Sequence, residues 1–471
     1  MERDKNKIYR VCGTPSRTGC VTCKGRPKCK RCIKARRTCE WCPPPSTHEQ
    51  PRSLLAPSYA PSPLPAVGHD ERQVLFFFAN FSAPGLSGHF SSDFWQRRIL
   101  QVSLAEPCIR HAVIAIGALH QHFNASQLVP TSQHHSSLQF ALRQHTKAIS
   151  HLQQILVTQA DRPELALMAC ILFVCFDSLF GNYQSALIHL RSGLNILQDI
   201  QTSGSSLPND QREEFASLLM RLGCQACLFL NPRSDNYRSA LWQELRTTIP
   251  DRPLARFDSI EDAHQALSSI GTEYICDRDP ARPVPILQSV LKQKHFILLV
   301  EWEQSLKEFL ARSDKSKPSI ERIVRGASLL KAFHLMVIIA VDNSRACDKL
   351  FSDIITLCEI VDTGQLTYAA PPEIFNFSTS LGITAPLFYT AMKCDNLALR
   401  RKAWKLLQRA PRKEGMWDAE LCARIVGKVL QILEPSGEQI TPENCGLRRE
   451  LQLRRKLKMD GFHPESLVEV L

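Results

Sequence analysis

The chain has 471 residues, of which 44% are hydrophobic and 22% charged, and only 20 are glycine. The low glycine content excludes a collagen-like chain, and the hydrophobic share excludes disorder throughout. The length predicts two to three domains, because a single core rarely grows beyond about 250–300 residues.

The net charge of +12 is concentrated in the first residues of the chain. Residues 1–42 hold 13 Lys and Arg against 3 Asp and Glu, whereas the rest of the chain holds 45 against 43. A basic segment on a near-neutral body predicts a polyanionic partner, most often a nucleic acid. A nuclear import signal or a solvated tail is the alternative, and an import signal is compatible with nucleic-acid contact.

Seven of the 18 cysteines lie in this basic segment. The opening residues, MERDKNKIYR, contain no apolar stretch typical of a secretory signal, so we expect reduced thiols rather than disulfides. Two Cys-x2-Cys pairs follow, and each can present two thiolates to one tetrahedral Zn²⁺. Free thiols in a basic tail are the weaker alternative, because so short a segment has no other means of forming a core. The predicted metal ligands are Cys20, Cys23, Cys29, Cys32, Cys39 and Cys42.

Residues 43–71 form a predicted linker, with eight prolines between Pro43 and Pro65. Proline at this density disfavours both helix and sheet, so we expect a semi-extended tether. No heptad pattern follows the cysteine segment, and a coiled-coil dimer is therefore not indicated there.

The pattern of residues 72–471 predicts one large all-α domain, in a chain that is mainly α. Apolar residues recur at helical spacing, and Pro107 occupies the place of a first-turn proline. The stripes are Ile109, Ala112, Val113, Ile116 and Leu119; Tyr183, Leu187, Leu190, Leu194 and Leu197; Ile320, Ile323, Val324, Ala327 and Leu330; and Leu399, Ala403, Leu406 and Leu407. Breaks are expected near 202–210, 249–253, 277–285 and 370–373.

Two apolar features of this domain have structural interpretations. The run from Leu165 to Phe176 is closed by Asp177 and is too short for a membrane span, so it predicts a buried helix. Cys224 and Cys227 lie in a helical context without a preceding strand, which favours buried thiols over a redox pair.

Polar and aromatic groups of the domain are likewise expected to be structural. His111 and His120 lack further ligands at metal spacing, so packing or surface roles are favoured. The basic stretches Arg400–Lys413 and 448–458 are expected to be solvated helix faces, with contact to DNA or importin as the alternative. The aromatic residues of LFFFANF and SDFW are expected in the core.

The stretch Gly19–Cys42, GCVTCKGRPKCKRCIKARRTCEWC, resembles the fungal Zn2Cys6 binuclear cluster of DNA-binding transcription factors. Its second half keeps the x2 and x6 cysteine spacings of that family. Phe81–His120 and Cys394–Leu421 are similar to parts of the helical regulatory domain of these factors, and the resemblance runs with gaps from about residue 74 to 435. It implies a zinc module that contacts DNA, usually at CGG-type triplets, joined to a helical regulatory domain.

The first half of the cluster departs from the family pattern, because about eight or nine residues are missing after Cys23. A binuclear cluster needs six thiolates, and five match. Cys42 or Cys12 could supply the sixth, or the two Cys-x2-Cys pairs could hold a single zinc. The shortening also removes part of the surface that reads bases in the family. The basic residues left for DNA contact are Lys24, Arg26, Lys28, Lys30, Arg31, Lys34, Arg36 and Arg37.

The sequence thus predicts a zinc-dependent, DNA-binding transcription factor that regulates RNA polymerase II genes in the nucleus. Expected partners are double-stranded DNA, the transcription machinery or co-regulators, and an import receptor; a homodimer is left open and no membrane contact is expected. One alternative is a regulator with a defective zinc cluster that acts through its helical domain without specific DNA binding. Another is an all-α enzyme or small-molecule sensor with a metal-binding tail. No GxGxxG after a strand, GxxxxGK[ST], HExxH or GxSxG motif is present, so no enzyme is expected.

Overall fold

The structure, a computed structural model, divides the chain into two compact units, residues 1–65 and 66–471. It describes residues 67–433 apart from 127–133, 159–161, 204–206, 230–234, 250–255, 278–284, 314–319, 364–375, 381 and 410–411, together with Lys34 and Arg36. The six predicted zinc ligands, most of the predicted linker and the basic stretch 448–458 lie outside the described residues. The domain boundaries drawn from the sequence therefore stay predictions.

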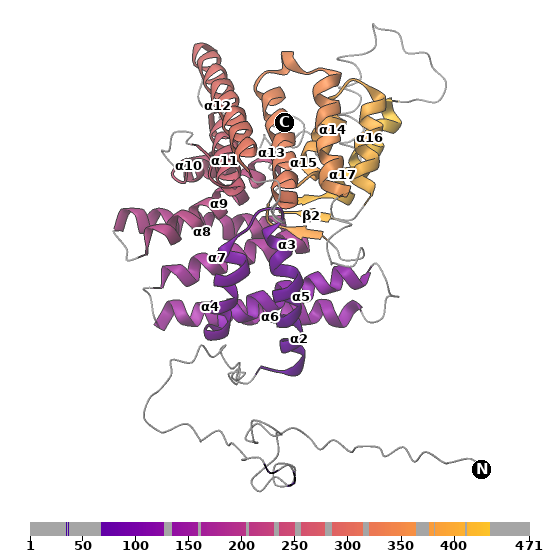
Figure 1. Cartoon of the computed structure of the whole chain (residues 1–471). Coiled ribbons are helices and arrows are strands. Elements are labelled where there is room, and N and C mark those ends of the chain that lie inside the picture. The colour runs from indigo at the N-terminus through magenta and orange to yellow at the C-terminus, as the bar shows by residue number, and fades with distance from the viewer. Residues whose placement is uncertain are drawn as a thin grey trace, which may run out of the picture. The chain divides into compact units, whose positions relative to one another are not determined.

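The described part of the second unit is mainly helical, as the sequence predicts (Figure 1). Its first α-helices are α2 (His69–Phe77), α3 (Ala83–Ser87), α4 (Ile99–Ala105), α5 (Pro107–Ser126), α6 (His134–Thr158), α7 (Pro163–Phe180), α8 (Tyr183–Ser203), α9 (Asn209–Phe229) and α10 (Asp235–Arg246). They are followed by α11 (Ile260–Asp277), α12 (Pro285–Arg312), α13 (Ile320–Val341), α14 (Asp348–Thr363), α15 (Thr384–Lys393), α16 (Leu397–Gln408) and α17 (Ala419–Leu433). Short π-helical turns η1 (Phe78–Ser82) and η2 (Phe94–Arg98) and a 3₁₀ turn η3 (Asn343–Arg345) complete the helical elements.

Helix boundaries follow local signals in the sequence. α5 begins at Pro107, where the missing N–H costs no hydrogen bond. α7 ends before Gly181, which adopts a left-handed φ of 91° and donates its N–H to the Asp177 carbonyl at 2.8 Å. α16 begins after Asn396, whose side-chain oxygen accepts from Ala398 N at 3.0 Å. The four apolar stripes fall on α5, α8, α13 and α16, which confirms those helix predictions.

α7 is the central helix of the first half of the unit and packs against α5, α8 and α9. Residues Leu165 to Leu179 are all buried, which confirms that the apolar run forms a buried helix. α7 and α13 are both long and apolar enough to cross a membrane, but 83% and 61% of their apolar windows are buried inside the unit. Burial of this kind is typical of core helices.

The second half of the unit continues from α9 by stepwise packing. α11 contacts α9, α12 and α13, and α13 contacts α14 and α15. α14, α15, α16 and α17 then pack against one another. In Figure 1 the helices α5 to α8 run across the view, whereas α12, α13, α14 and α17 run up it. α9 and α11 thus join two groups of helices with different directions.

A small three-stranded sheet corrects the prediction of an all-α domain. β1 (Asn376–Ser378) pairs in parallel with β2 (Arg412–Glu414), and β2 pairs antiparallel with β3 (Trp417–Asp418). α15 and α16 lie between β1 and β2 in the chain and form the crossover that a parallel pair requires. Strands of two or three residues are too short to show an alternating pattern, so the sequence contains no signal for them.

Two other expectations were wrong for a few individual residues. Phe78, Phe94 and Trp95 are in the core as predicted, but Phe76 is 69% exposed because it lies on the outer face of α2. The cations of the basic run that lie on α16 are largely solvated, but Arg412 and Lys413 at the end of the run belong to β2, and their side chains are only 2% and 12% exposed. The Arg412 guanidinium pairs with the Asp362 carboxylate at the end of α14, 2.7 Å away.

Candidate functional site

The predicted DNA- and zinc-binding residues are nearly all outside the described residues. Lys34 and Arg36 are described and exposed, and the structure adds nothing to their predicted roles. Within the described part of the chain, no group of three or more His, Cys, Asp or Glu side chains could hold a metal ion.

A cavity of about 80 Å³ lies between α9, α11 and α13 in the second unit. By the same measure a single water needs about 10–15 Å³, so the cavity has room for a small organic molecule. Its walls are mostly apolar, with a few polar groups, which is the usual composition of a ligand pocket. Its lining includes Phe90, Arg221, His264, Gly271, Phe333 and Met336.

The fourth wall of the cavity comes from the turn after α3. Gly88 ends α3 with a φ of +63°, a conformation that glycine adopts without strain, and reverses the chain direction. Phe90, two residues later, lies over the meeting point of α11 and α13 and is 5% exposed. Its ring stacks on the His264 ring with centroids 3.9 Å apart.

Arg221 on α9 is the cationic group of the cavity. Its Nη1 donates to Ser217 Oγ at 2.8 Å and to Gln265 Oε1 at 3.3 Å. Burial lowers the pKa of Arg221 to about 10, although the nearby Glu214 carboxylate raises it. The side chain is half-buried, and the guanidinium stays charged at neutral pH.

His264 on α11 borders the same cavity beside Arg221. Burial and the Arg221 charge hold the pKa of His264 well below its ordinary value. The ring is therefore neutral at pH 7 and has one nitrogen that can donate a hydrogen bond and one that can accept.

A second, more polar cavity of about 160 Å³ adjoins the first, and Phe90, Arg221 and His264 line both. Three carboxylates line the second cavity, and each of them forms an ion pair with an arginine. The pairs are Asp93 with Arg97 at 2.7 Å, Glu214 with Arg98 at 3.2 Å, and Glu261 with Arg322 at 2.6 Å. Among the described residues, none of these carboxylates forms an ion pair with Arg221, although Glu214 lies near enough to raise its pKa.

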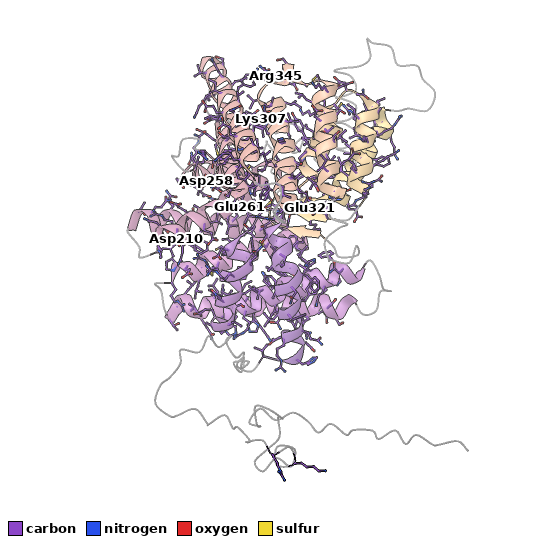
Figure 2. All side chains as sticks on the ribbon, in the orientation of Figure 1. Asp210, Asp258, Glu261, Lys307, Glu321 and Arg345 are labelled. Carbon is purple, nitrogen blue, oxygen red and sulfur yellow. The ribbon has the colours of Figure 1, made fainter. Side chains whose placement is uncertain are left out.

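The loop over the cavities is held in place by Glu261, which is labelled in Figure 2 at the first turn of α11. One of its carboxylate oxygens accepts from both the backbone N–H and the hydroxyl of Ser91, each at 2.7 Å. The same oxygen pairs with Arg322 on α13. These contacts connect the loop, α11 and α13 at the edge of the cavities.

Gly271 gives the first cavity its shape. It lies inside α11, and a Cβ built on it would meet no heavy atom within 4 Å. The space beside this glycine is therefore part of the cavity rather than a close helix contact. Gly223 on α9 differs, since a Cβ there would lie 2.3 Å from Leu245 Cδ2.

Gln225 connects the cavity wall to the small sheet. Its Nε2 donates to the Thr379 carbonyl at 2.8 Å, and its Oε1 accepts from Met416 N at 3.3 Å. Gly415, with a φ of +61°, leaves room for this amide, because a Cβ on it would lie 1.5 Å from Gln225 Oε1. These hydrogen bonds connect the α9 wall of the cavity to Thr379 and Met416, which follow it much later in the chain.

Of the residues that line this cavity, the sequence singled out Leu330 as part of an apolar helical stripe and Cys224 as a buried thiol. Cys224 and Cys227 are buried in α9, which confirms that interpretation, and burial raises the pKa of Cys224 to about 11. Arg221 and His264 were missed. The only local signal was an arginine within an apolar helix, RLGCQAC, and many surface helices contain the same pattern.

The two histidines considered as metal ligands have structural roles. His120 is buried, and its Nδ1 forms a 2.9 Å hydrogen bond with Ser82 Oγ. His111 is half-buried, and its Nδ1 lies 2.6 Å from Gln144 Oε1. Both contacts agree with the packing roles that the sequence favours.

Residues 74–245 match the fungal specific transcription factor domain. This range includes Phe90 and the α9 wall of the cavity, whereas α11 and α13 follow it in the chain. The cavity thus lies between the matched region and the helices after it. The comparison with solved structures found no match.

Three related proteins are named as transcription regulators. The aspercryptin biosynthesis cluster-specific transcription regulator atnN of Emericella nidulans is 28% identical over 228 residues, which cover 41% of this chain and 36% of that protein. The transcription regulator lscL of Purpureocillium lilacinum is 25% identical over 189 residues, covering 37% and 45%. The Zn(2)-C6 fungal-type transcription factor afumD of Aspergillus fumigatus is 31% identical over 166 residues, covering 31% and 44%. The matches span less than half the length of these relatives.

Proposed function

We propose that this chain is a nuclear regulator of RNA polymerase II transcription whose N-terminal cysteine module binds zinc and contacts DNA. In this proposal the helical unit is a regulatory domain rather than an enzyme. Co-regulators or the transcription machinery and an import receptor are its protein partners.

The observation that carries the proposal is the pairing of two features in one chain. Residues 74–245 match the fungal specific transcription factor domain, and a basic segment with two Cys-x2-Cys pairs precedes it. The relative afumD is named as a Zn(2)-C6 factor, which supports zinc as the metal. The local excess of Lys and Arg supports an electrostatic contact with phosphates.

The zinc content tests the first part of the proposal. Five cysteines keep the family spacing, so we expect zinc in the purified chain but fewer than two ions per molecule. Native mass spectrometry of the full chain measures this number directly. A matched variant in which Cys29 and Cys32 are replaced by Ser should lose the metal, whereas Cys347→Ser should not. A chain that binds no zinc would contradict a metal module.

DNA binding tests the second part. The remaining basic residues can neutralise phosphates, but the segment that reads bases is shortened. We therefore expect binding that falls steeply with salt and differs little between a CGG-containing duplex and a scrambled one. A salt series with both duplexes measures the slope and the preference. Absence of DNA binding at about 50 mM salt would contradict DNA contact and favour the second candidate.

The second candidate is a regulator that acts through its helical domain without specific DNA binding. The missing sixth cysteine at family spacing favours it. Two zinc ions per chain together with a clear CGG preference would exclude this candidate, because both would require a complete cluster.

A further inference from the structure

The cavity between α9, α11 and α13 contains a charge without a directly paired counter-charge. Each of the three carboxylates around Arg221 forms an ion pair with another arginine. No ion pair joins Arg221 to any carboxylate of the described residues, and only Nη1 makes hydrogen bonds, with Ser217 and Gln265. Arg221 is half-buried, so its guanidinium has lost part of its water without gaining an ion-pair partner, and a bound anion would offset this cost.

The rest of the cavity is suited to an apolar body. Phe333 and Met336 come from α13, Leu267 comes from α11, and Phe90 covers them from the loop after α3. Gly271 leaves open space beside α11. An apolar cavity with a single cation at its edge selects a molecule that has one anionic end.

We propose that this cavity binds a small monocarboxylate, with its single ring or short branched chain in the apolar part and its carboxylate on Arg221. The neutral His264 ring lies beside Arg221 and can donate a second hydrogen bond to the same carboxylate. The volume of about 80 Å³ limits the apolar part to one ring or a chain of similar size. A carboxylate at Arg221 would also face the polar cavity, where water can solvate its outer side.

The proposal goes beyond the proposed DNA binding and concerns the helical unit alone. It suggests a role for the cavity as an effector site, because a ligand there would contact three helices and the loop after α3. Its test uses neither DNA nor zinc, so its failure and the failure of the proposed function are distinguishable.

The test measures binding of phenylacetate and 3-methylbutyrate to the purified full chain by isothermal titration calorimetry. Phenylacetamide serves as the neutral analogue of nearly the same shape. We expect saturable binding of at least one of the two acids and about ten- to a hundredfold weaker binding of the amide, because the charge-assisted hydrogen bonds to Arg221 are lost.

Two variants test separately how the Arg221 charge and the cavity space contribute to binding. Arg221→Met should reduce the affinity for the acid to that for the amide. The control Arg212→Met lies on the same helix but outside both cavities, and it should leave the affinities for the acid and for the amide unchanged. Gly271→Leu should fill the cavity and abolish binding of the acid and the amide. Its far-UV circular dichroism should equal that of the unmodified chain, because the added side chain enters open space.

Three results would overturn the proposal. The first is equal affinity for acid and amide in the unmodified chain. The second is acid binding that survives in Gly271→Leu, since it would place the ligand elsewhere. The third is the absence of saturable binding of both acids up to about 10 mM.

Discussion

Asp362 binds two arginines of very different exposure, and this contrast gives a quantitative prediction. Its Oδ1 lies 2.7 Å from Arg412 Nη2, and Arg412 is 2% exposed; its Oδ2 lies 3.2 Å from Arg409 Nη1, and Arg409 is 59% exposed. Asp362→Ala leaves the Arg412 charge buried without this carboxylate, which should lower the free energy of unfolding by about 3–5 kcal/mol. Arg409→Ala removes only an exposed pair and should cost about 1 kcal/mol or less.

The double variant Asp362→Leu/Arg412→Met distinguishes the loss of the ion pair from the cost of leaving one buried charge without its partner. It removes both charges together, so most of the stability lost in Asp362→Ala should return. Urea unfolding of the full chain, followed by far-UV circular dichroism, measures all four proteins at one pH. The reasoning is refuted if Asp362→Ala costs no more than Arg409→Ala, or if the double variant is as unstable as Asp362→Ala.

Three further predictions concern other sites. Burial raises the pKa of Asp177 from 3.8 to about 7, so this carboxyl binds its proton more tightly in the folded chain, and the free energy of unfolding falls as the pH rises from about 4 to 7. Asp177→Asn should therefore equal the native chain at pH 4 and exceed its unfolding free energy by about 2–4 kcal/mol at pH 8; equal stability at pH 8 would contradict this. Gly415→Ala should cost at least about 2 kcal/mol in urea unfolding, because it forces a left-handed φ and displaces the Gln225 amide; a loss below about 0.5 kcal/mol would refute the close contact. A fluorescently tagged chain should accumulate in the nucleus and lose that bias when residues 24–37 are deleted; an unchanged distribution would place the import signal elsewhere, first at 448–458.

The helices could be predicted because their signals are local. Pro107 at the start of α5 and the apolar stripe from Tyr183 on α8 lie within one or two helical turns of the boundaries that they indicate. The buried character of α7 follows from its composition alone, since no polar face interrupts Leu165 to Phe176. Such features need no knowledge of the partner helix.

The sheet and the cavity could not be predicted, because both depend on segments far apart in the chain. Asn376 of β1 pairs with Arg412 of β2, and strands this short have no pattern of their own. Arg221 resembles any helix arginine in the sequence, and its special environment arises only when α11 and the loop at Phe90 pack beside it. The predicted zinc ligands are a different case: their spacing is a local signal, and the prediction awaits the metal measurement.

Among the described residues, the hydrogen bonds that join the most distant parts of the chain have a consequence for how the protein is made. Thr379 donates both its N–H and its hydroxyl to the Leu86 carbonyl at the end of α3, across 293 residues. At about 5–20 residues per second, a ribosome needs about 15–60 s to synthesise the intervening chain. Until then Leu86 of α3 lacks its hydrogen-bond partner, and the face of α9 that contacts the sheet remains uncovered. We therefore expect newly made chains to depend on chaperones up to the moment when residues near 379 emerge, and fragments that end at residue 245 to aggregate.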